Sequence, residues 1–433
     1  MELESKGKLL LNEGAWTNRV KILQVSRLAE EHLVAGLDIG TSKVAVAIAA
    51  KDGLGSCKII GVGTGLHNGL QRGVIRDTDA VRQAVTEAVI KAERMAQRPM
   101  PPAVVGIPGS LSSSFTARGT VPIRRSGHRV QAEDVERALG AAKAMSIPPG
   151  RRVIHRILRG FWLDGRHLPG EPVGLVGRHL EVEVQFVTIA LSAWEELTSF
   201  LEQGDVAVAK MTVQCLATAD MVLALDQKKL GVVLVDLGAG LTDIVVYHAD
   251  KLQHMACLPM GTRNLALDLM MGLDITLEDA ECLVRKLGCH LSPENIARFQ
   301  EGWQGDIGGR SFSLEQYAEI FDARAEEIWQ LVRSQIAKVG GNSNLQAGVR
   351  MVGGGVLIPG LKDLGSSILG LPVDASLPVE MANLPESWLS PGYASAVGLV
   401  QHRTTGLSAL PKPRTKKPAW TALWPRIRGW LKF

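Results

Sequence analysis

The chain has 433 residues, too many for one ordinary hydrophobic core and enough for two to four compact units. Hydrophobic residues make up 46% and charged residues 21%, as is typical of a soluble globular protein, and the net charge is only +4. The five cysteines include no Cys-x-x-Cys pair, and no uncharged apolar run reaches the ~18 residues of a spanning helix, which argues against a zinc site, a disulfide framework and a transmembrane segment.

The N-terminal part predicts a polar extension followed by a hairpin and a helix. Residues 1–33 mix acids and bases and lack the apolar core of a signal peptide. Two apolar runs, 33–39 and 44–50, flank a turn at Gly40, and this pattern predicts a β-hairpin. Apolar residues recur at helical spacing over 79–95, which predicts a helix.

A separate module is predicted from about residue 103 to residue 187. Its expected elements are a strand at 104–107, a helix at 131–145 and an alternating strand at 180–187. A further helix is predicted after the module, at 194–203.

The second half of the chain repeats the pattern of the first hairpin. Strands are predicted at 230–236 and 243–248, on either side of a turn that contains Gly238 and Gly240. A short strand at 350–352 leads into three successive glycines. Helices are predicted at 277–287, at 314–339 and, rich in small residues, at 392–401.

Both hairpins place an aspartate, Asp38 or Asp236, at the end of an apolar strand and small residues in the turn that follows. Glycine lets backbone N–H groups approach an anion closely, and threonine and serine hydroxyls add donors. Either turn alone is better explained as an ordinary β-turn, because Asp and Gly are common turn residues. With the glycine turn at 353–355, against which adenine and ribose could lie, the two hairpins form a combination that favours a nucleoside triphosphate site.

The candidate site has three parts. The expected nucleotide- and phosphate-binding residues are Gly40, Thr41, Ser42, Lys43, Gly238, Ala239, Gly240, Thr242, Gly353, Gly354 and Gly355. Asp38 and Asp236 are expected to hold Mg²⁺ through its waters. Gln214 is the candidate for positioning a water, but glutamine is no general base and no acid of that role is identifiable, so any ATP hydrolysis should be slow.

These motifs resemble those of the actin, Hsp70 and sugar-kinase superfamily, and segments 213–219 and 392–398 are similar to its two connecting helices. The resemblance narrows to the FtsA family of bacterial cell-division proteins and covers about residues 34–402 and the tail. The chain departs from the pattern at Ala239, where the superfamily usually has glycine, and at 107–111 in the inserted module. The family resemblance is carried by segments 73–77, 93–96, 133–136, 142–148, 172–175, 178–181 and 319–327.

The resemblance implies an α/β, actin-like two-domain ATPase fold with an inserted α+β subdomain and a C-terminal amphipathic helix. The expected parts are a polar extension 1–33, a first domain 34–102 and 188–229, an inserted subdomain 103–187, a second domain 230–271 and 346–402 with its upper part 272–345, a basic Pro-rich linker 403–419 and an amphipathic helix 420–433.

The resemblance also implies a function. An FtsA-like protein binds ATP and Mg²⁺, polymerises into actin-like filaments and tethers the FtsZ ring to the cytoplasmic face of the plasma membrane at the division site. The expected partners are the C-terminal peptide of FtsZ, further copies of the chain and an anionic membrane surface, and no nucleic-acid partner is expected. The peptide is expected on the upper part of the second domain, near Glu319, Arg324 and Glu327.

The tail supplies separate evidence. Eight of the 48 basic residues and no acidic residue follow position 402, so the rest of the chain has 40 basic against 44 acidic residues, and the tail alone is suited to an anionic partner. As a helix, residues 420–433 would span ~21 Å, too little for a hydrocarbon core of ~30 Å, so they would lie in the interface or dock on protein. The apolar face and its basic flanks predict membrane binding by Trp420, Leu423, Trp424, Ile427, Trp430, Leu431, Arg426, Arg428 and Lys432.

Other readings of the superfamily resemblance stay open. A small-molecule kinase of the same fold needs a carboxylate base beside the terminal phosphate and gives no reason for a lipid-seeking tail. An Hsp70-like chaperone needs a substrate-binding domain, for which the 35 residues after Gly398 are too few. A PilM-like pilus-assembly protein shares the fold, and the Trp- and Arg-rich tail favours the FtsA-like reading over it.

Overall fold

The computed structural model describes residues 32–51, 57–124, 127–144, 147–289, 306–307, 310–377 and 384–401. The sequence predictions for residues 1–31, for the linker 403–419 and for the helix 420–433 with its membrane-binding residues lie outside the described residues. Within the described part, no helix is long and apolar enough to cross a membrane.

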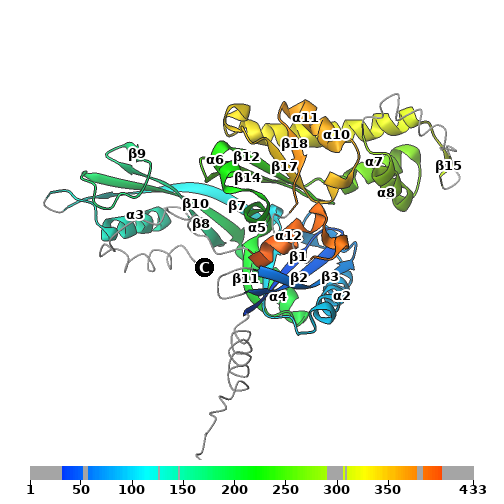
Figure 1. Ribbon diagram of the computed structural model, residues 1–433, viewed down its shortest axis with the longest axis horizontal. Helices are drawn as coiled ribbons and strands as arrows, with labels where there is room; N and C mark the ends of the chain where they lie inside the picture. The colour runs from blue at the N-terminus through cyan, green and yellow to red at the C-terminus, as the bar shows by residue number, and fades with distance from the viewer. Residues whose placement is uncertain are drawn as a thin grey trace, which may run out of the picture.

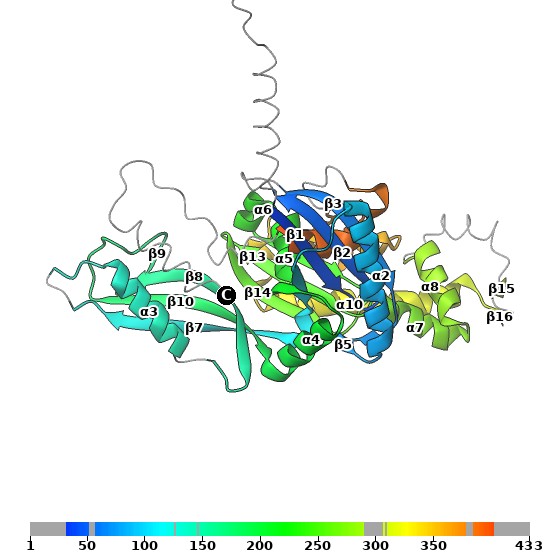
Figure 2. The same ribbon diagram turned by 90° about the horizontal axis from the view of Figure 1, so that it is seen from below.

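The first domain is built on a five-stranded sheet in the order β11-β6-β1-β2-β3. Its strands are β1 (His32–Ile39), β2 (Lys43–Lys51), β3 (Cys57–Leu66), β6 (Ala103–Ile107) and β11 (Val208–Val213). The first predicted hairpin is confirmed, since β1 and β2 pair antiparallel with Ile39 opposite Val44. The predicted helix at 79–95 is α2 (Thr78–Ala96), which packs against β2 and β3 (Figures 1 and 2).

Three glycines explain why α2 lies so close to β3. Gly61, Gly63 and Gly65 alternate along the strand and therefore share one face of the sheet. A Cβ added to Gly63 would lie 1.8 Å from the carbonyl oxygen of Ala88 in α2. A Cβ added to Gly61 or to Gly65 would lie 2.3 or 2.1 Å from another backbone carbonyl oxygen of the same helix. Only glycine admits this backbone contact, which sets the end of β3 beside the first hairpin.

One strand was assigned wrongly from the sequence. The prediction placed 104–107 in the inserted module, but β6 pairs in parallel with β1 and with β11 and belongs to the first sheet. Parallel partners lie far apart in the chain, so no local pattern revealed this pairing.

The inserted subdomain follows β6 and projects from the side of the molecule as a long arm (Figures 1 and 2). Its sheet has the order β7-β10-β8-β9 and is covered by one helix. Phe186 and Leu180 of the sheet and Leu139 of the helix lie in its core. Its elements are β7 (Ser112–Pro122), α3 (Ala132–Ala144), β8 (Arg151–Leu163), β9 (Arg166–Leu168) and β10 (His179–Ala190).

The second domain has a sheet of the same size in the order β14-β13-β12-β17-β18. The second predicted hairpin is confirmed, because β12 and β13 pair antiparallel around the turn at Gly238. Tyr317, Phe321 and Trp329 of the long helix α10 are buried in the core of this domain. Its elements are β12 (Val232–Leu237), β13 (Thr242–His248), β14 (Lys251–Leu258), α7 (Thr262–Leu273), α8 (Leu277–Lys286), β15 (Asp306–Ile307), β16 (Arg310–Ser311), α10 (Leu314–Ala337), β17 (Val349–Val352), α11 (Leu361–Leu369) and β18 (Val373–Ala375).

Two helices of small residues cross between the domains, α5 (Gln214–Val222) and α12 (Ala394–Gln401). A Cβ added to Gly398 would lie 2.6 Å from the carbonyl oxygen of Ala217, so the crossing requires glycine there. Thr218 and Ser395 join the helices through their hydroxyl oxygens at 3.0 Å. The remaining described elements are short strands and helices: β4 (Leu70–Gln71), β5 (Val74–Ile75), η2 (Gly109–Leu111), α4 (Leu191–Gln203), α6 (Leu225–Leu230), η3 (Gly341–Asn344), η4 (Gly354–Leu357), η5 (Glu386–Trp388) and η6 (Pro391–Tyr393).

Candidate nucleotide site

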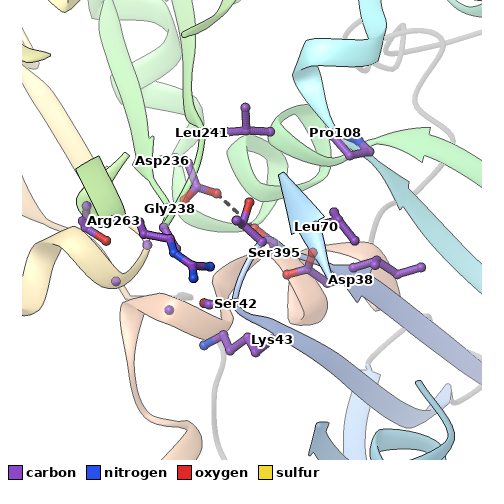
Figure 3. A pocket seen from close by; sticks show the side chains of 18 of the residues that line it. Asp38, Ser42, Lys43, Leu70, Pro108, Asp236, Gly238, Leu241, Arg263 and Ser395 are labelled. Atoms are coloured by element: carbon purple, nitrogen blue, oxygen red, sulfur yellow. Dashed lines mark hydrogen bonds between the residues drawn. The ribbon is translucent and has the colours of Figure 1, made fainter. Parts of the chain in front are cut away.

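One pocket of about 720 Å³ lies between the two domains and brings both hairpins and the triple-glycine turn together. Figure 3 shows Asp38, Ser42 and Lys43 of the first domain facing Asp236, Gly238 and Arg263 of the second. Of the predicted residues, the pocket is lined by Asp38, Gly40, Thr41, Ser42, Lys43, Gln214, Asp236, Gly238, Ala239, Gly353 and Gly354.

The two hairpins fold into the same backbone turn. The N–H of Gly40 donates to the carbonyl oxygen of Lys43 at 3.0 Å, and that of Gly238 donates to Leu241 at 2.9 Å. The turns touch each other, because a Cβ added to Gly240 would lie 2.7 Å from Cγ2 of Thr41. Hairpins from separate domains therefore form two walls of a single pocket.

The triple-glycine turn is held by close backbone approach. Gly353 has a φ of +86°, and a Cβ there would lie 2.6 Å from Oδ1 of Asp236, so no other residue fits without strain. Its N–H donates to the carbonyl oxygen of Pro391 at 3.1 Å. Gly354 faces open space on the pocket side, where a flat ligand could lie against the backbone.

Three carboxylates lie at the floor of the pocket: Asp38 and Asp243 are buried and Asp236 is half-buried. Burial, with Asp236 as the nearby like charge, raises the pKa of Asp38 and of Asp243 from 3.8 to about 7. Burial also raises the pKa of Asp236, which accepts a hydrogen bond from Ser395 at 3.1 Å. The Oδ1 atoms of Asp38 and Asp243 have no hydrogen-bond partner among the described residues. Such groups are stabilised by a cation or by added donors.

Lys43 is the cation on the other side of this floor. Burial lowers its pKa, while Asp38 and Asp236 oppose that shift. Its Nζ lies 3.6 Å over the ring centroid of Tyr393, which in turn stacks on Trp388 at 4.2 Å. An aromatic face holds an ammonium group weakly, so Lys43 remains available to an anionic ligand.

The residues present fit a hydrated metal ion. No group of three or more His, Cys, Asp or Glu side chains in the described ranges is close enough to hold a metal directly. Asp38 and Asp236 would reach Mg²⁺ through its waters, and the orphaned Oδ1 of Asp38 offers such a water an acceptor.

Three predicted residues do not line the pocket. Thr242 is fully buried and donates from its hydroxyl to the carbonyl oxygen of Met260 at 2.8 Å. Gly240 packs on Thr41, and Gly355 packs on Leu237. All three support the walls of the pocket and do not face its interior.

Sequence reasoning missed several lining residues. Asp243 lies seven positions after Asp236 on the paired strand, and its acidic side chain beside the second turn was an available signal. His67, Arg263 and Ser395 carried no local signal, because they reach the pocket only through tertiary packing. The other missed lining residues include Asn68, Gly73, Thr262, Ala266, Glu281, Val284, Arg285, Leu357, Ile358 and Gly392.

The residues predicted to bind a peptide lie on α10. Glu319 and Glu327 are exposed, whereas Arg324 is half-buried. Arg324 donates from Nε to Asp268 of α7 at 2.5 Å and also pairs with Glu327. Arg324 therefore joins two helices of the second domain, whether or not a partner contacts it.

Comparison with known proteins places these features in a family. A family model described as "Cell division protein FtsA" matches residues 233–398, and one described as "SHS2 domain inserted in FTSA" matches residues 109–188. The chain is 31% identical over 374 residues to the cell division protein FtsA of Pseudomonas aeruginosa, covering 86% of this chain and 89% of that one. It is 28% identical over 418 residues to that of Escherichia coli, covering 94% and 99%.

A solved structure supports the fold. The chain is similar to the "PilM-PilN type IV pilus biogenesis complex" with a TM-score of 0.60 and 15% identity, covering 85% of this chain and 97% of that one. The likeness at this identity shows a shared actin-like fold.

Proposed function

The chain belongs to the FtsA family of cell-division proteins, and from this premise we propose that it is an ATP-binding tether between the FtsZ ring and the cytoplasmic face of the membrane. The observation that carries the nucleotide part is the interdomain pocket, where two glycine hairpins face each other above three carboxylates with raised pKa values. Family membership favours this function over a small-molecule kinase or a PilM-like role.

In the proposed complex, the backbone N–H groups of both hairpins and the ammonium group of Lys43 bind the phosphates. Asp38 and Asp236 orient the waters of Mg²⁺, which when bound neutralises phosphate charge. The turn at 353–355 would hold the base, and Val284 and Arg285 of α8 line the same pocket.

Slow hydrolysis is the expected chemistry. Gln214, the first residue of α5, orients a water, and Asp243, with a pKa of about 7, accepts its proton. Asp243 is the acid–base group that the sequence alone did not identify. Asp243 is buried and Gln214 is half-buried, and both line the pocket between the domains, so hydrolysis depends on how tightly the two domains close around the nucleotide.

The tether part rests on the family and on the sequence of the tail. The FtsZ peptide docks on the upper second domain beside α10, the tail binds an anionic lipid surface, and copies of the chain assemble into filaments. The test is co-sedimentation of the full chain and FtsZ with anionic vesicles, with and without Mg·ATP. FtsZ should reach the vesicle pellet only when the full chain is present, and more strongly with nucleotide. A chain that pellets with vesicles but leaves FtsZ in the supernatant would contradict the tether.

A further inference from the structure

A contact between the two domains crosses the phosphate end of the pocket. Nη1 of Arg263, from α7 of the second domain, donates to Oδ1 of Asn68, which follows β3 of the first domain, at 3.2 Å. Both residues line the pocket, and they are 195 positions apart in the chain. The contact therefore depends on the relative position of the domains.

Each side of this contact, which we call an arm, is joined by a backbone hydrogen bond to one of the two hairpins. The N–H of Arg263 donates to the carbonyl oxygen of Ala239 at 2.8 Å, in the second hairpin. The N–H of His67, next to Asn68, donates to Ser42 at 3.2 Å, in the first. The arms and hairpins form a ring around the pocket, so a ligand held by the hairpins lies within reach of both arms.

The charge of Arg263 is not neutralised in this arrangement. Its side-chain partner in the described part of the chain is the neutral amide of Asn68, and none of the ion pairs found there includes Arg263. Arginine binds phosphate through paired N–H donors, and such charge-assisted bonds are stronger than a bond to an amide oxygen. A phosphate oxygen would therefore displace Asn68.

A second polar group points to an anion at the same place. His67 lines the pocket and is only 8% exposed. Its Nδ1 accepts the N–H of Gly69 at 3.1 Å, so the proton of the neutral ring is on Nε2. Burial lowers the pKa of His67, and a hydrogen-bonding interaction with the Gly40 backbone opposes that shift. Nε2 is buried and makes no hydrogen bond of normal geometry among the described residues, although the Gly40 backbone of the first hairpin is near the ring, so Nε2 can donate to an acceptor bound at that hairpin.

We propose that Arg263, His67 and Asn68 form a clasp that binds the terminal phosphate of a nucleoside triphosphate. Arg263 exchanges Asn68 for a terminal-phosphate oxygen, and Nε2 of His67 donates to the same group. This inference rests on the proposed nucleotide site and adds to it a means of distinguishing a triphosphate from a diphosphate. Because the arms come from different domains, the clasp links the terminal phosphate to domain closure.

The test is calorimetric titration of the full chain with Mg²⁺ and either a non-hydrolysable ATP analogue or ADP. Arg263→Gln should lower the affinity for the analogue by about ten-fold or more, as expected for a lost charged hydrogen bond, and leave ADP within about two-fold. Asn68→Asp lies at an exposed position and should not disturb folding. It should hold Arg263 in an ion pair, repel the phosphate and lower the affinity for the analogue more than for ADP.

Arg285→Gln is the matched control, since Arg285 also lines the pocket but lies on α8, outside the two hairpins and the clasp. It should change both affinities by the same factor. Equal losses for both nucleotides in Arg263→Gln, or no loss for either, would overturn the clasp and leave the nucleotide site intact. If neither nucleotide binds the wild-type chain, the proposed nucleotide site fails and the clasp fails with it.

Discussion

Asp38 and Asp243 combine burial with the like charge of Asp236, and both have a pKa near 7. A carboxyl group with a raised pKa binds its proton more tightly in the folded chain than in the unfolded one. The stability that this proton contributes is fully present below 3.8, the pKa of the carboxyl group in the unfolded chain, and it is lost as the pH rises through the folded pKa of about 7. The nucleotide-free protein should therefore lose stability as the pH rises from about 4 to about 7.

Asp38→Asn tests this effect on stability. Without nucleotide, the variant should have a higher Tm than the wild type at pH 8. Its free energy of unfolding should exceed that of the wild type by on the order of 1 kcal/mol or more at pH 8, and this difference should shrink at pH 5. Thermal unfolding followed by circular dichroism at both pH values measures it. Asp226→Asn is the control, because Asp226 is exposed and should show no such difference. A variant that unfolds below the wild type at pH 8 would contradict the charge assignment.

Asp236→Ala tests the proposed metal site. Removing this carboxylate should weaken binding of Mg·ATP by about ten-fold or more, because the hydrated ion loses an acceptor. Asp236→Asn keeps the contact with Ser395 and isolates the loss of charge. Calorimetry that gives wild-type affinity for Asp236→Ala would remove Asp236 from the site.

At the scale of elements, local patterns predicted what local contacts build. The two hairpins, α2, α3 and α10 were predicted close to their observed bounds, because their spacing of apolar residues and their turns are visible in one stretch of chain. Strands β7 and β8 were not predicted, because they are only partly buried and are rich in Ser and Arg. Strand β6 was assigned to the wrong domain, because the strands it pairs with lie far away in the sequence. In the site, the glycine turns and the aspartates Asp38 and Asp236 were predictable from the sequence. His67 and Arg263 were not, because only tertiary packing brings them to the pocket.

Helix α10 carries a prediction about the partner. Arg324→Glu should abolish pull-down of the C-terminal FtsZ peptide if the peptide binds near Glu319 and Glu327. Because Arg324 also pairs with Asp268 of α7, the substitution by itself places like charges together and weakens the contact between helices. Pull-down with purified, folded variants is therefore the measurement.

The double variant Arg324→Glu with Asp268→Arg separates the two effects. It restores an ion pair between α7 and α10 but not the charge presented to the peptide. Peptide binding should stay lost in a double variant that unfolds at the wild-type temperature. Recovery of binding along with stability would show that Arg324 supports the fold and does not contact FtsZ.

At the scale of the whole molecule, the tail and the folded body have opposite charge. Residues 403–433 contribute eight of the 48 basic residues and none of the 44 acidic ones. A helix as short as 420–433 is marginal in water, because nucleation is costly and few hydrogen bonds follow it. If the tail binds a lipid surface as a helix, burial of Trp424, Ile427 and Leu431 would offset the ordering cost at ~25 cal/mol per Å² of apolar area. One tail should bind weakly, and a filament that presents many tails to one membrane should bind strongly.

The prediction is that the tail alone confers vesicle binding and that its apolar and charged parts act differently with salt. Trp424→Glu should abolish co-sedimentation with anionic vesicles at any ionic strength, because it puts a charge in the centre of the apolar face. Lys416→Glu with Lys417→Glu should weaken binding mainly at low salt, where charges at the lipid surface are least screened. Neutral vesicles are the control and should bind the wild type less. If a chain that lacks 420–433 still sediments with anionic vesicles, another surface binds the membrane, and the tail is better explained as a docking helix for a protein partner.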